Sequence, residues 1–227
     1  NQLEAARIKV KKALELTSQT LGFASEGTFG PHPSFPYISC NRELVILIDT
    51  VNELQIVGQE FSTETNYNHK TIQSVEEAFD FAKQVGFPEH GLVVMTEPET
   101  KDEIIKGITT NEQLADAVEL MLKKSPNANV HIETDMRALY NPTRMKAIEK
   151  ATRDLIKKVR QICPECSCPG FAVTERKSGL PCALCSFPTP MALAAVYQCQ
   201  KCEFSQEVLF PDGLEKADPS QCEYCNP

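Results

Sequence analysis

Residues 163–166 read CPEC, and the same Cys-x-x-Cys spacing returns as CALC at 182–185, CQKC at 199–202 and CEYC at 222–225. A Cys-x-x-Cys turn presents two thiolates from one tight loop, and a structural Zn²⁺ ion takes four such ligands in a tetrahedron. Four of these turns therefore predict two closed zinc sites. The predicted metal ligands are Cys163, Cys166, Cys182, Cys185, Cys199, Cys202, Cys222 and Cys225.

The order in which the four turns combine is left open by the sequence. Joining neighbouring turns leaves 15 and 19 residues between the two turns of each site, a separation typical of zinc ribbons. The cross-braced alternative joins the first turn to the third and the second to the fourth. The ribbon spacing favours the sequential arrangement. In either case we expect residues 161–227 to form a double zinc-ribbon-like module whose two structural Zn ions replace a large apolar core.

Charge limits the partners of this module. Residues 163–227 contain four Lys and Arg against eight Asp and Glu, and two tetrathiolate zinc centres would add a charge of about −4. The net charge of the whole 227-residue chain is −8. Phosphate backbones are bound by clustered Lys and Arg, so this charge disfavours nucleic acid and anionic membranes as partners. We expect the module to dock on its own first domain, on a partner protein or on a second copy as a homo-oligomer.

The composition, with 41% hydrophobic and 24% charged residues, is typical of a globular protein. No apolar run approaches the roughly 20 residues that span a bilayer, so no membrane segment is predicted. The chain also lacks a recognisable secretory signal. Together with cysteines paired for metal rather than for disulfides, this predicts a cytoplasmic location. Because the chain opens inside a predicted helix and without Met, we expect the natural protein to contain residues upstream of Asn1.

Local patterns in residues 1–160 predict an α/β or α+β domain with a mixed β-sheet. The apolar run RELVILIDT and the following LQIVGQE predict a β-hairpin. The two glycines and three prolines of GTFGPHPSFP (27–36) predict a loop after a short strand. Helices are predicted over residues 1–19, 74–86 and 141–160 and after Thr110, and strands over 21–25, 42–50, 54–60, 91–96, 103–108 and 129–134.

Polar residues gather beside turns in four stretches of this domain: Glu26 in ASEGTFGPHP (24–33), Asp49 after the apolar strand, Glu64, Asn66 and His69 in STETNYNH (62–69), and Glu133, Asp135, Arg137, Asn141 and Arg144 in ETDMRALYNPTR (133–144). Carboxylates beside turns suit a hard cation such as Mg²⁺, and arginines near a helix N-terminus suit a phosphate. The candidate catalytic residues are Glu26 and Asp49. The candidate substrate-binding residues are Arg137, Arg144, Glu64 and Asn66. Simpler roles compete: Asp49 can end a strand and Asn141 can cap a helix.

Several of these segments resemble known families. ASEGTFGPHP, NRELVILID, TETN, TDMRALYNPTRM and ADPSQCEYCNP resemble an uncharacterised bacterial family, a domain of unknown function that ends in zinc-ribbon-like cysteines. That resemblance implies no activity. EAARIKVKKA, LGFASEG, ELVILID and TDMRALYNPTRM are similar in order to segments of inosine-triphosphate pyrophosphatases, which hydrolyse nucleoside triphosphates with Mg²⁺. This second resemblance implies that Glu26 binds the metal and that Arg137 or Arg144 lies near substrate, but the Asp pair of one branch of those enzymes is absent.

Two functional hypotheses follow. The first is a Mg²⁺-dependent hydrolase of nucleotides or other phosphate-containing small molecules. The alternative is a non-enzymatic zinc-ribbon adaptor that binds a protein or a small ligand. They differ in one structural expectation: a hydrolase needs Glu26, Asp49, Arg137 and Arg144 to line one pocket.

Overall fold

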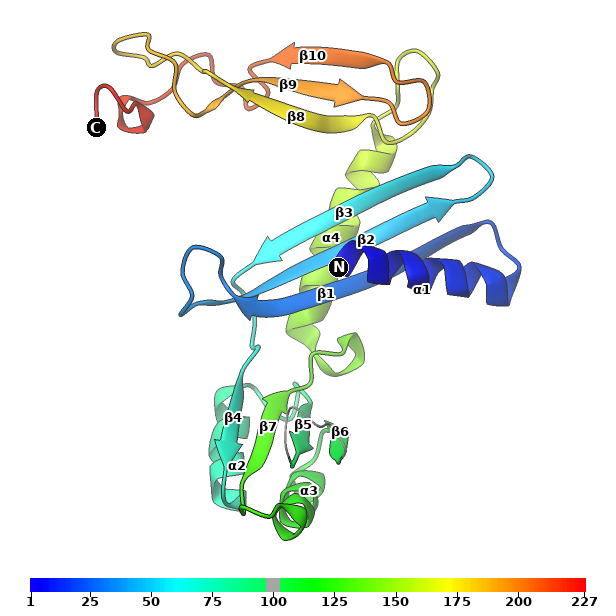
Figure 1. Ribbon diagram of the computed structural model, residues 1–227, viewed down its shortest axis with the longest axis vertical. Helices are drawn as coiled ribbons and strands as arrows, with labels where there is room; N and C mark the ends of the chain where they lie inside the picture. The colour runs from blue at the N-terminus through cyan, green and yellow to red at the C-terminus, as the bar shows by residue number, and fades with distance from the viewer. Residues whose placement is uncertain (97–102) are drawn as a thin grey trace. The chain divides into compact units, whose positions relative to one another are not determined.

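The computed structural model of the protein describes residues 1–96 and 103–227, and Figure 1 labels their helices and strands. These residues form two compact units. Unit 1 contains residues 1–18, 23–46 and 58–154, and unit 2 contains residues 19–22, 47–57 and 155–227. The described part of the chain contains no helix with the length and apolar character that a membrane crossing requires. The elements are α1 (Gln2–Thr17), β1 (Leu21–Pro31), β2 (Ser39–Asp49), β3 (Leu54–Ser62), β4 (His69–Ile72), α2 (Val75–Gln84), β5 (Leu92–Met95), β6 (Ile104–Ile108), α3 (Asn111–Lys124), β7 (Val130–Thr134), η1 (Ala138–Tyr140), α4 (Pro142–Arg160), β8 (Ala172–Ser178), β9 (Ala192–Gln198), β10 (Ser205–Leu209) and η2 (Pro219–Gln221).

The strands form three small sheets, with the orders β1-β2-β3, β4-β7-β5-β6 and β10-β9-β8. The neighbouring pairs in the second and third sheets are antiparallel, so the predicted mixed sheet is wrong. The reason lies in the second sheet. Strands β4 and β5 are joined by α2 and both run antiparallel to β7. Because β7 inserts between them, the two parallel strands never pair with each other.

Helices α2, α3 and α4 begin at the capping residues that the sequence predicts. The side chain of Ser74 accepts a hydrogen bond from Glu77 N at the start of α2, and Thr110 does the same for Gln113 N at the start of α3. Asn141 Oδ1 accepts from Arg144 N at 2.9 Å, at the start of α4. Side-chain oxygens of this kind satisfy backbone N–H groups that have no partner inside the helix. The predicted β-hairpin is also confirmed, as β2 and β3.

Strand β1 differs from the expectation. Residues 27–31, predicted as part of a loop, continue the strand as far as Pro31. β1 is an edge strand of its sheet, and glycine and proline are tolerated at edges and strand ends, where no ladder hydrogen bond is lost. The turn comes later and is closed by a 2.7 Å bond from His32 N to Ile38 O. Strand β4 was not predicted at all, because its four residues are mostly polar and exposed.

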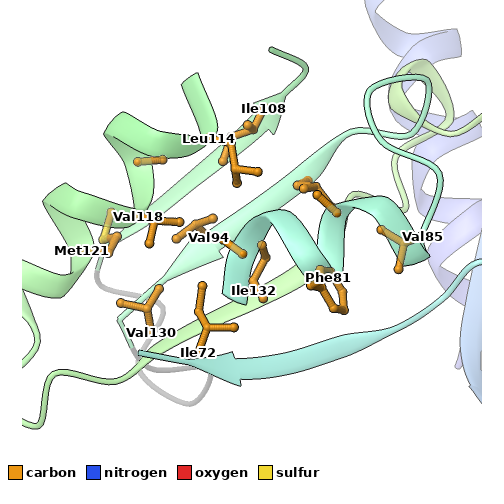
Figure 2. Close-up of a cluster of buried hydrophobic side chains, with 14 residues drawn as sticks. Ile72, Phe81, Val85, Val94, Ile108, Leu114, Val118, Met121, Val130 and Ile132 are labelled. Atoms are coloured by element: carbon orange, nitrogen blue, oxygen red, sulfur yellow. The ribbon is translucent and has the colours of Figure 1, made fainter. Parts of the chain in front are cut away.

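The core of unit 1 lies on one face of the sheet β4-β7-β5-β6 and is covered by α2 and α3 (Figure 2). Alternate residues of β7, Val130 and Ile132, are fully buried against side chains of both helices. The intervening residues of β7 point to the opposite face, because side chains alternate along a strand. The core cluster consists of Ile72, Ala78, Phe81, Ala82, Val85, Leu92, Val94, Ile108, Leu114, Ala117, Val118, Met121, Val130 and Ile132.

The cysteine-rich part of unit 2 is built on the sheet β10-β9-β8. Its outer strands are almost entirely exposed, and buried residues occur mainly in the central strand β9. Phe171 stacks on Tyr197 and Phe204, with ring centroids 5.7 and 5.9 Å apart. This apolar contribution is small for a segment of this length, so its fold needs another source of stability.

Candidate metal centres and polar pocket

The structure gathers the eight predicted cysteines into two quartets. One contains Cys163, Cys166, Cys199 and Cys202, and the other contains Cys182, Cys185, Cys222 and Cys225; within each quartet all sulfur atoms lie within 4.8 Å of one another. The first turn therefore combines with the third and the second with the fourth. This is the cross-braced arrangement, so the sequential pairing favoured by the spacing is wrong.

Strand direction explains this pairing. Strand β8 starts shortly after the first turn and β9 ends directly before the third, and Ala172 of β8 lies opposite Gln198 of β9. The first and third turns consequently lie at one end of the sheet. Each of these strands has seven residues, which at 3.3 Å per residue span about 23 Å. The second turn, between β8 and β9, is thus held at the other end.

The fourth turn is brought to the second by the chain that precedes it. Ala217 N donates to Pro181 O and Ala183 N donates to Ala217 O, both at 2.9 Å. These two bonds hold Ala217 beside the second turn. Because Ala217 lies only five residues before Cys222, the fourth turn is held near the second turn as well. Consecutive turns in the sequence therefore belong to different cysteine quartets.

The sulfur separations fit a tetrahedral metal ion. Sγ atoms lie 3.6 Å apart for Cys163 and Cys202 and 3.5 Å apart for Cys166 and Cys199. In the second quartet the corresponding distances are 3.9 and 3.7 Å. A regular tetrahedron with Zn–S bonds of about 2.3 Å has S···S edges of about 3.8 Å, whereas a disulfide requires about 2.05 Å. The geometry thus suits four thiolates around one ion in each quartet.

Backbone N–H groups of the turns donate hydrogen bonds to two of the cysteine sulfurs. Leu184 N donates to Cys182 Sγ and Lys201 N donates to Cys199 Sγ, each at 3.4 Å. Backbone hydrogen bonds, that from Cys185 N–H being the largest contribution, lower the pKa of Cys182 to about 7. In the same way, the backbone hydrogen bond from Cys202 is the main cause that lowers the pKa of Cys199 to about 6. Both thiols can therefore ionise near neutral pH, as metal ligation requires.

The first three turns share one backbone form. In the first, Cys163 N donates to Cys168 O at 2.9 Å and Ser167 N donates to Cys163 O at 3.0 Å. The same two bonds recur in the second and third turns. The residue after the second cysteine adopts a left-handed conformation each time, with φ of 59° at Ser167, 60° at Ser186 and 61° at Glu203. Non-glycine residues adopt this conformation only at a cost in energy.

A polar pocket of about 350 Å³ lies in unit 1. Of the candidate substrate-binding residues, Arg137 and Arg144 line it, together with the carboxylates of Glu133 and Asp135. Two aromatic rings, Phe29 and Tyr67, stack with centroids 6.0 Å apart. The lining consists of Phe29, Tyr67, Val93, Lys106, Glu133, Thr134, Asp135, Met136, Arg137 and Arg144.

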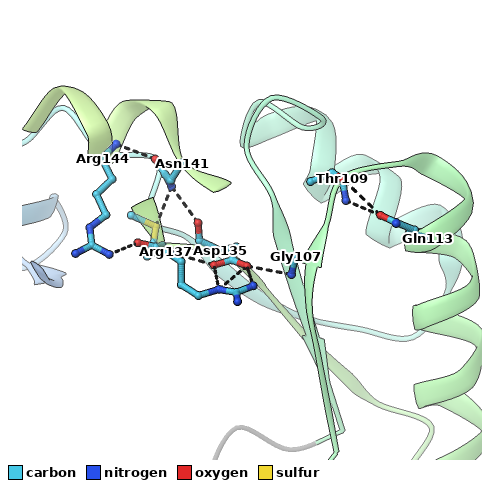
Figure 3. A network of polar contacts seen from close by, with 8 residues as sticks. Gly107, Thr109, Gln113, Asp135, Arg137, Asn141 and Arg144 are labelled. Atoms are coloured by element: carbon cyan, nitrogen blue, oxygen red, sulfur yellow. Dashed lines mark hydrogen bonds and ion pairs between the residues drawn. The ribbon is translucent and has the colours of Figure 1, made fainter. Parts of the chain in front are cut away.

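Arg137 is held by a buried carboxylate (Figure 3). Its Nε lies 2.9 Å from Asp135 Oδ1 and its Nη2 lies 2.6 Å from Oδ2, while Gly107 N donates to the same Oδ2 at 3.0 Å. The hydrogen bond to Asp135 raises the pKa of Arg137. The guanidinium also stacks on the Tyr140 ring at 4.6 Å. Asp135 is 2% exposed and Arg137 is half exposed, so the pair presents one fixed cation at the pocket surface.

Arg144 makes a second pair, with Glu43 from the apolar strand β2. Its Nη2 lies 3.1 Å from Glu43 Oε1, its Nε 3.2 Å from Oε2, and its Nη1 donates to Met136 O at 2.6 Å. Glu43 is completely buried. Burial disfavours the charged carboxylate and raises the pKa of Glu43, while the hydrogen bond from Arg144 opposes this shift. A Cβ at residue 27 would lie 2.6 Å from Glu43 Oε2, so the first glycine of GTFGPHPSFP leaves room for this pair.

The remaining candidate residues make other contacts. Glu26 lies in the middle of β1, with its Oε2 2.5 Å from Lys9 Nζ. Asp49 belongs to unit 2, where its Oδ1 accepts from Val51 N and Asn52 N in the turn after β2. Several hydrogen bonds lower the pKa of Asp49, and the bond from the Asn52 side chain has the largest effect. Glu64 pairs with Lys150 Nζ at 3.1 Å. Asn66 donates to Val85 O and accepts from Asn141. None of these four is among the described residues that line the pocket.

Comparison with protein-family models gives a match over most of the chain. The family model described as Domain of unknown function (DUF6671) matches residues 9–227. The chain belongs to this family. No curated protein and no solved structure matches it. The resemblance of this DUF6671 chain to an uncharacterised family is thereby confirmed, and the matched range includes both cysteine quartets and the pocket. Its resemblance to inosine-triphosphate pyrophosphatases stays a prediction.

The sequence missed one important residue of the DUF6671 pocket. Glu43 directly precedes the apolar run LVILI (44–48) in the strand NRELVILID. Carboxylates are almost never fully buried without a partner, so an acid in such a run signals a buried cation opposite it. A buried acid implies a partner arginine or lysine but does not identify it. The partner, Arg144, lies 101 residues from Glu43 in the sequence, so no local pattern connects the two.

Proposed function

We propose that this DUF6671 protein binds two structural zinc ions and that they stabilise its C-terminal module. The observation that carries the proposal is the set of S···S distances, 3.5–3.9 Å, which match the edges of a Zn–S₄ tetrahedron. Four protein ligands leave no coordination position open, which is the property of a structural site rather than a catalytic one. The exposed outer strands of the sheet support the same role, because metal binding then supplies folding free energy that the small core lacks.

Metal analysis of freshly purified, reduced protein tests this proposal. We expect about two zinc ions per chain. Removal of the metal with a strong chelator should unfold residues 161–227, observed as loss of protection from protease in that segment. Reduced protein that contains no metal and keeps a protected C-terminal module would contradict the proposal.

For unit 1 we propose that the pocket binds a small phosphate-containing ligand without hydrolysing it. The volume of about 350 Å³ lies within the range of small-molecule sites. Asp135 takes the Nε and Nη2 edge of Arg137, and no hydrogen bond among the described residues involves its Nη1. A half-exposed guanidinium with a free end is suited to an anionic oxygen.

The contacts of the candidate catalytic acids favour binding over hydrolysis. Glu26 pairs with Lys9 and Asp49 holds a turn, and neither lines the pocket. A Mg²⁺-dependent hydrolase would therefore need other carboxylates for its metal. Glu133 and Asp135 are the acids present, and Asp135 is already engaged by Arg137.

A thermal-shift panel of nucleotides, sugar phosphates and inorganic phosphate tests the binding, with pyrophosphate and phosphate release measured in the presence of Mg²⁺. We expect at least one phosphate compound to raise the melting temperature, without turnover. Arg137→Gln should abolish the shift, whereas Arg153→Gln, at an exposed α4 pair with Glu149, should retain it. No shift from any compound would refute ligand binding, and turnover would restore the hydrolase hypothesis.

A further inference from the structure

The sheet β4-β7-β5-β6 has a second face, opposite the core, on which two histidines and a glutamate lie. His131 and Glu133 of β7 alternate with the buried Val130 and Ile132, so both point away from α2 and α3. His69 of β4 is paired directly with Glu133, and directly opposed residues share a face. Two imidazoles and one carboxylate therefore lie together on this face.

The three side chains lie close to one another but are not yet arranged around an ion. His131 Nε2 lies 3.6 Å from Glu133 Oε2, and the ring centroids of His69 and His131 are 5.4 Å apart. The His131 side chain is 12% exposed and that of Glu133 is 36% exposed, so both are partly fixed by their surroundings. His69 is exposed. Exposed side chains change rotamer within nanoseconds, so His69 is the member that can rotate to complete the set.

We propose that His69, His131 and Glu133 bind one divalent transition-metal ion such as Zn²⁺, at a third site distinct from the cysteine quartets. Imidazole and carboxylate are established ligands for Zn²⁺ and its neighbours in the first transition row. Three protein ligands leave a coordination position open, in contrast to the closed sulfur sites. Nothing in the zinc module or in the ligand-binding proposal is needed for this inference.

The site adjoins the pocket. Glu133 lines the pocket, as does Tyr67, whose ring lies 6.1 Å from that of His69. Lys106 and Val93 share the face, since Val93 is paired with both Glu133 and Lys106. An ion at this position would place its open coordination position beside the groups that we propose for an anionic ligand. The pocket would then contain a Lewis acid as well as fixed cations.

The simpler interpretation is a His131–Glu133 side-chain contact beside two ring contacts on a polar sheet face. That arrangement has no effect on metal stoichiometry, so a metal titration separates the two interpretations. Metal-free, reduced full-length protein is titrated with Co²⁺ under inert gas. We expect three equivalents: two that produce thiolate-to-cobalt charge-transfer absorption, and a third that adds weak visible bands with no further charge transfer.

Variants assign the third equivalent. His69→Ala and His131→Ala should each bind two equivalents with unchanged charge-transfer absorption. His90→Ala is the matched control and should bind three, because His90 bonds to Thr143 and Gly86 instead. Glu133→Gln should weaken the third equivalent by more than about tenfold, since loss of a mere outer partner of a metal ligand already has that effect. His69 is exposed, so its replacement leaves folding intact.

Two results would overturn the proposal. One is a wild-type titration that ends at two equivalents. The other is a third equivalent that survives in both His69→Ala and His131→Ala, which would assign it to adventitious binding elsewhere on the chain.

Discussion

Cys163 Sγ lies 3.6 Å from Cys202 Sγ although the two residues are 39 positions apart, and a whole Cys-x-x-Cys turn of the other site lies between them in the sequence. The second quartet shows the same relationship, with 43 positions between Cys182 and Cys225. The two sites are therefore interleaved along the chain rather than placed one after the other.

Interleaving predicts the metal content of double cysteine variants. Cys163→Ser with Cys202→Ser damages one site, so about one zinc ion per chain should remain. Cys163→Ser with Cys182→Ser damages both sites, so none should remain. Sequential pairing predicts the reverse for the two double variants. Zinc measured in reduced protein decides between these arrangements.

Glycine at the end of a cysteine turn should stabilise the zinc-loaded module. Glu203 has a φ of 61°, and Glu203→Gly removes a Cβ that disfavours this conformation. We expect a gain of about 0.5–1 kcal/mol in the free energy of unfolding. Glu165→Gly, within the first turn but without a positive φ, is the control and should give no gain. Equal effects in the two variants, measured by denaturant titration, would contradict this explanation.

Gly27→Ala should destabilise unit 1, whereas Gly30→Ala in the same strand should be nearly neutral. The new Cβ at residue 27 would lie 2.6 Å from Glu43 Oε2 and 2.9 Å from Arg144 Nη2, while residue 30 has nothing within 4 Å. Overpacking at such a position costs about 1–3 kcal/mol. The two melting temperatures give the comparison, and a larger loss for Gly30→Ala would show that the Glu43–Arg144 pair tolerates the extra methyl group.

Arg144→Met should leave Glu43 buried without its cation and cost about 3–5 kcal/mol. This loss in the free energy of unfolding should be smaller at low pH. Burial raises the pKa of Glu43 above its ordinary value of 4.5, so the folded state binds a proton more tightly than the unfolded state. Stability due to this group therefore falls as the pH rises from 4.5 through the folded pKa, and more steeply without Arg144.

Denaturant titrations of wild type and Arg144→Met between pH 4 and 8 measure this dependence. The difference between the two proteins should be largest at the alkaline end. The double variant Glu43→Leu with Arg144→Met is the control, and it should lose this pH dependence and recover part of the stability. A difference that is independent of pH would exclude Glu43 as its source.

The sequence predicts those features that depend on neighbouring residues. Ser74, Thr110 and Asn141 begin helices because each caps the backbone N–H three residues later. The position of β7 between β4 and β5 depends instead on distant segments, and so does the pairing of the cysteine turns. For the same reason the eight cysteines of the two quartets could be named from spacing alone, whereas their division into quartets could not. Glu26 illustrates why candidate site residues are hard to predict from the sequence. A carboxylate suits metal binding, but in the structure that of Glu26 forms an ion pair with Lys9.

The alternation of the two cysteine quartets along the chain also determines what a single peptide-bond cleavage can release. A cut anywhere between Cys166 and Cys222 separates at least one quartet into two fragments, so a bound ion still joins the pieces. With neighbouring turns paired, one cut between Cys185 and Cys199 would free the end of the chain. If metal ions occupy both quartets, at least one ion would bridge the fragments made by such a cut, and a nicked protein would stay in one piece until its metal is removed.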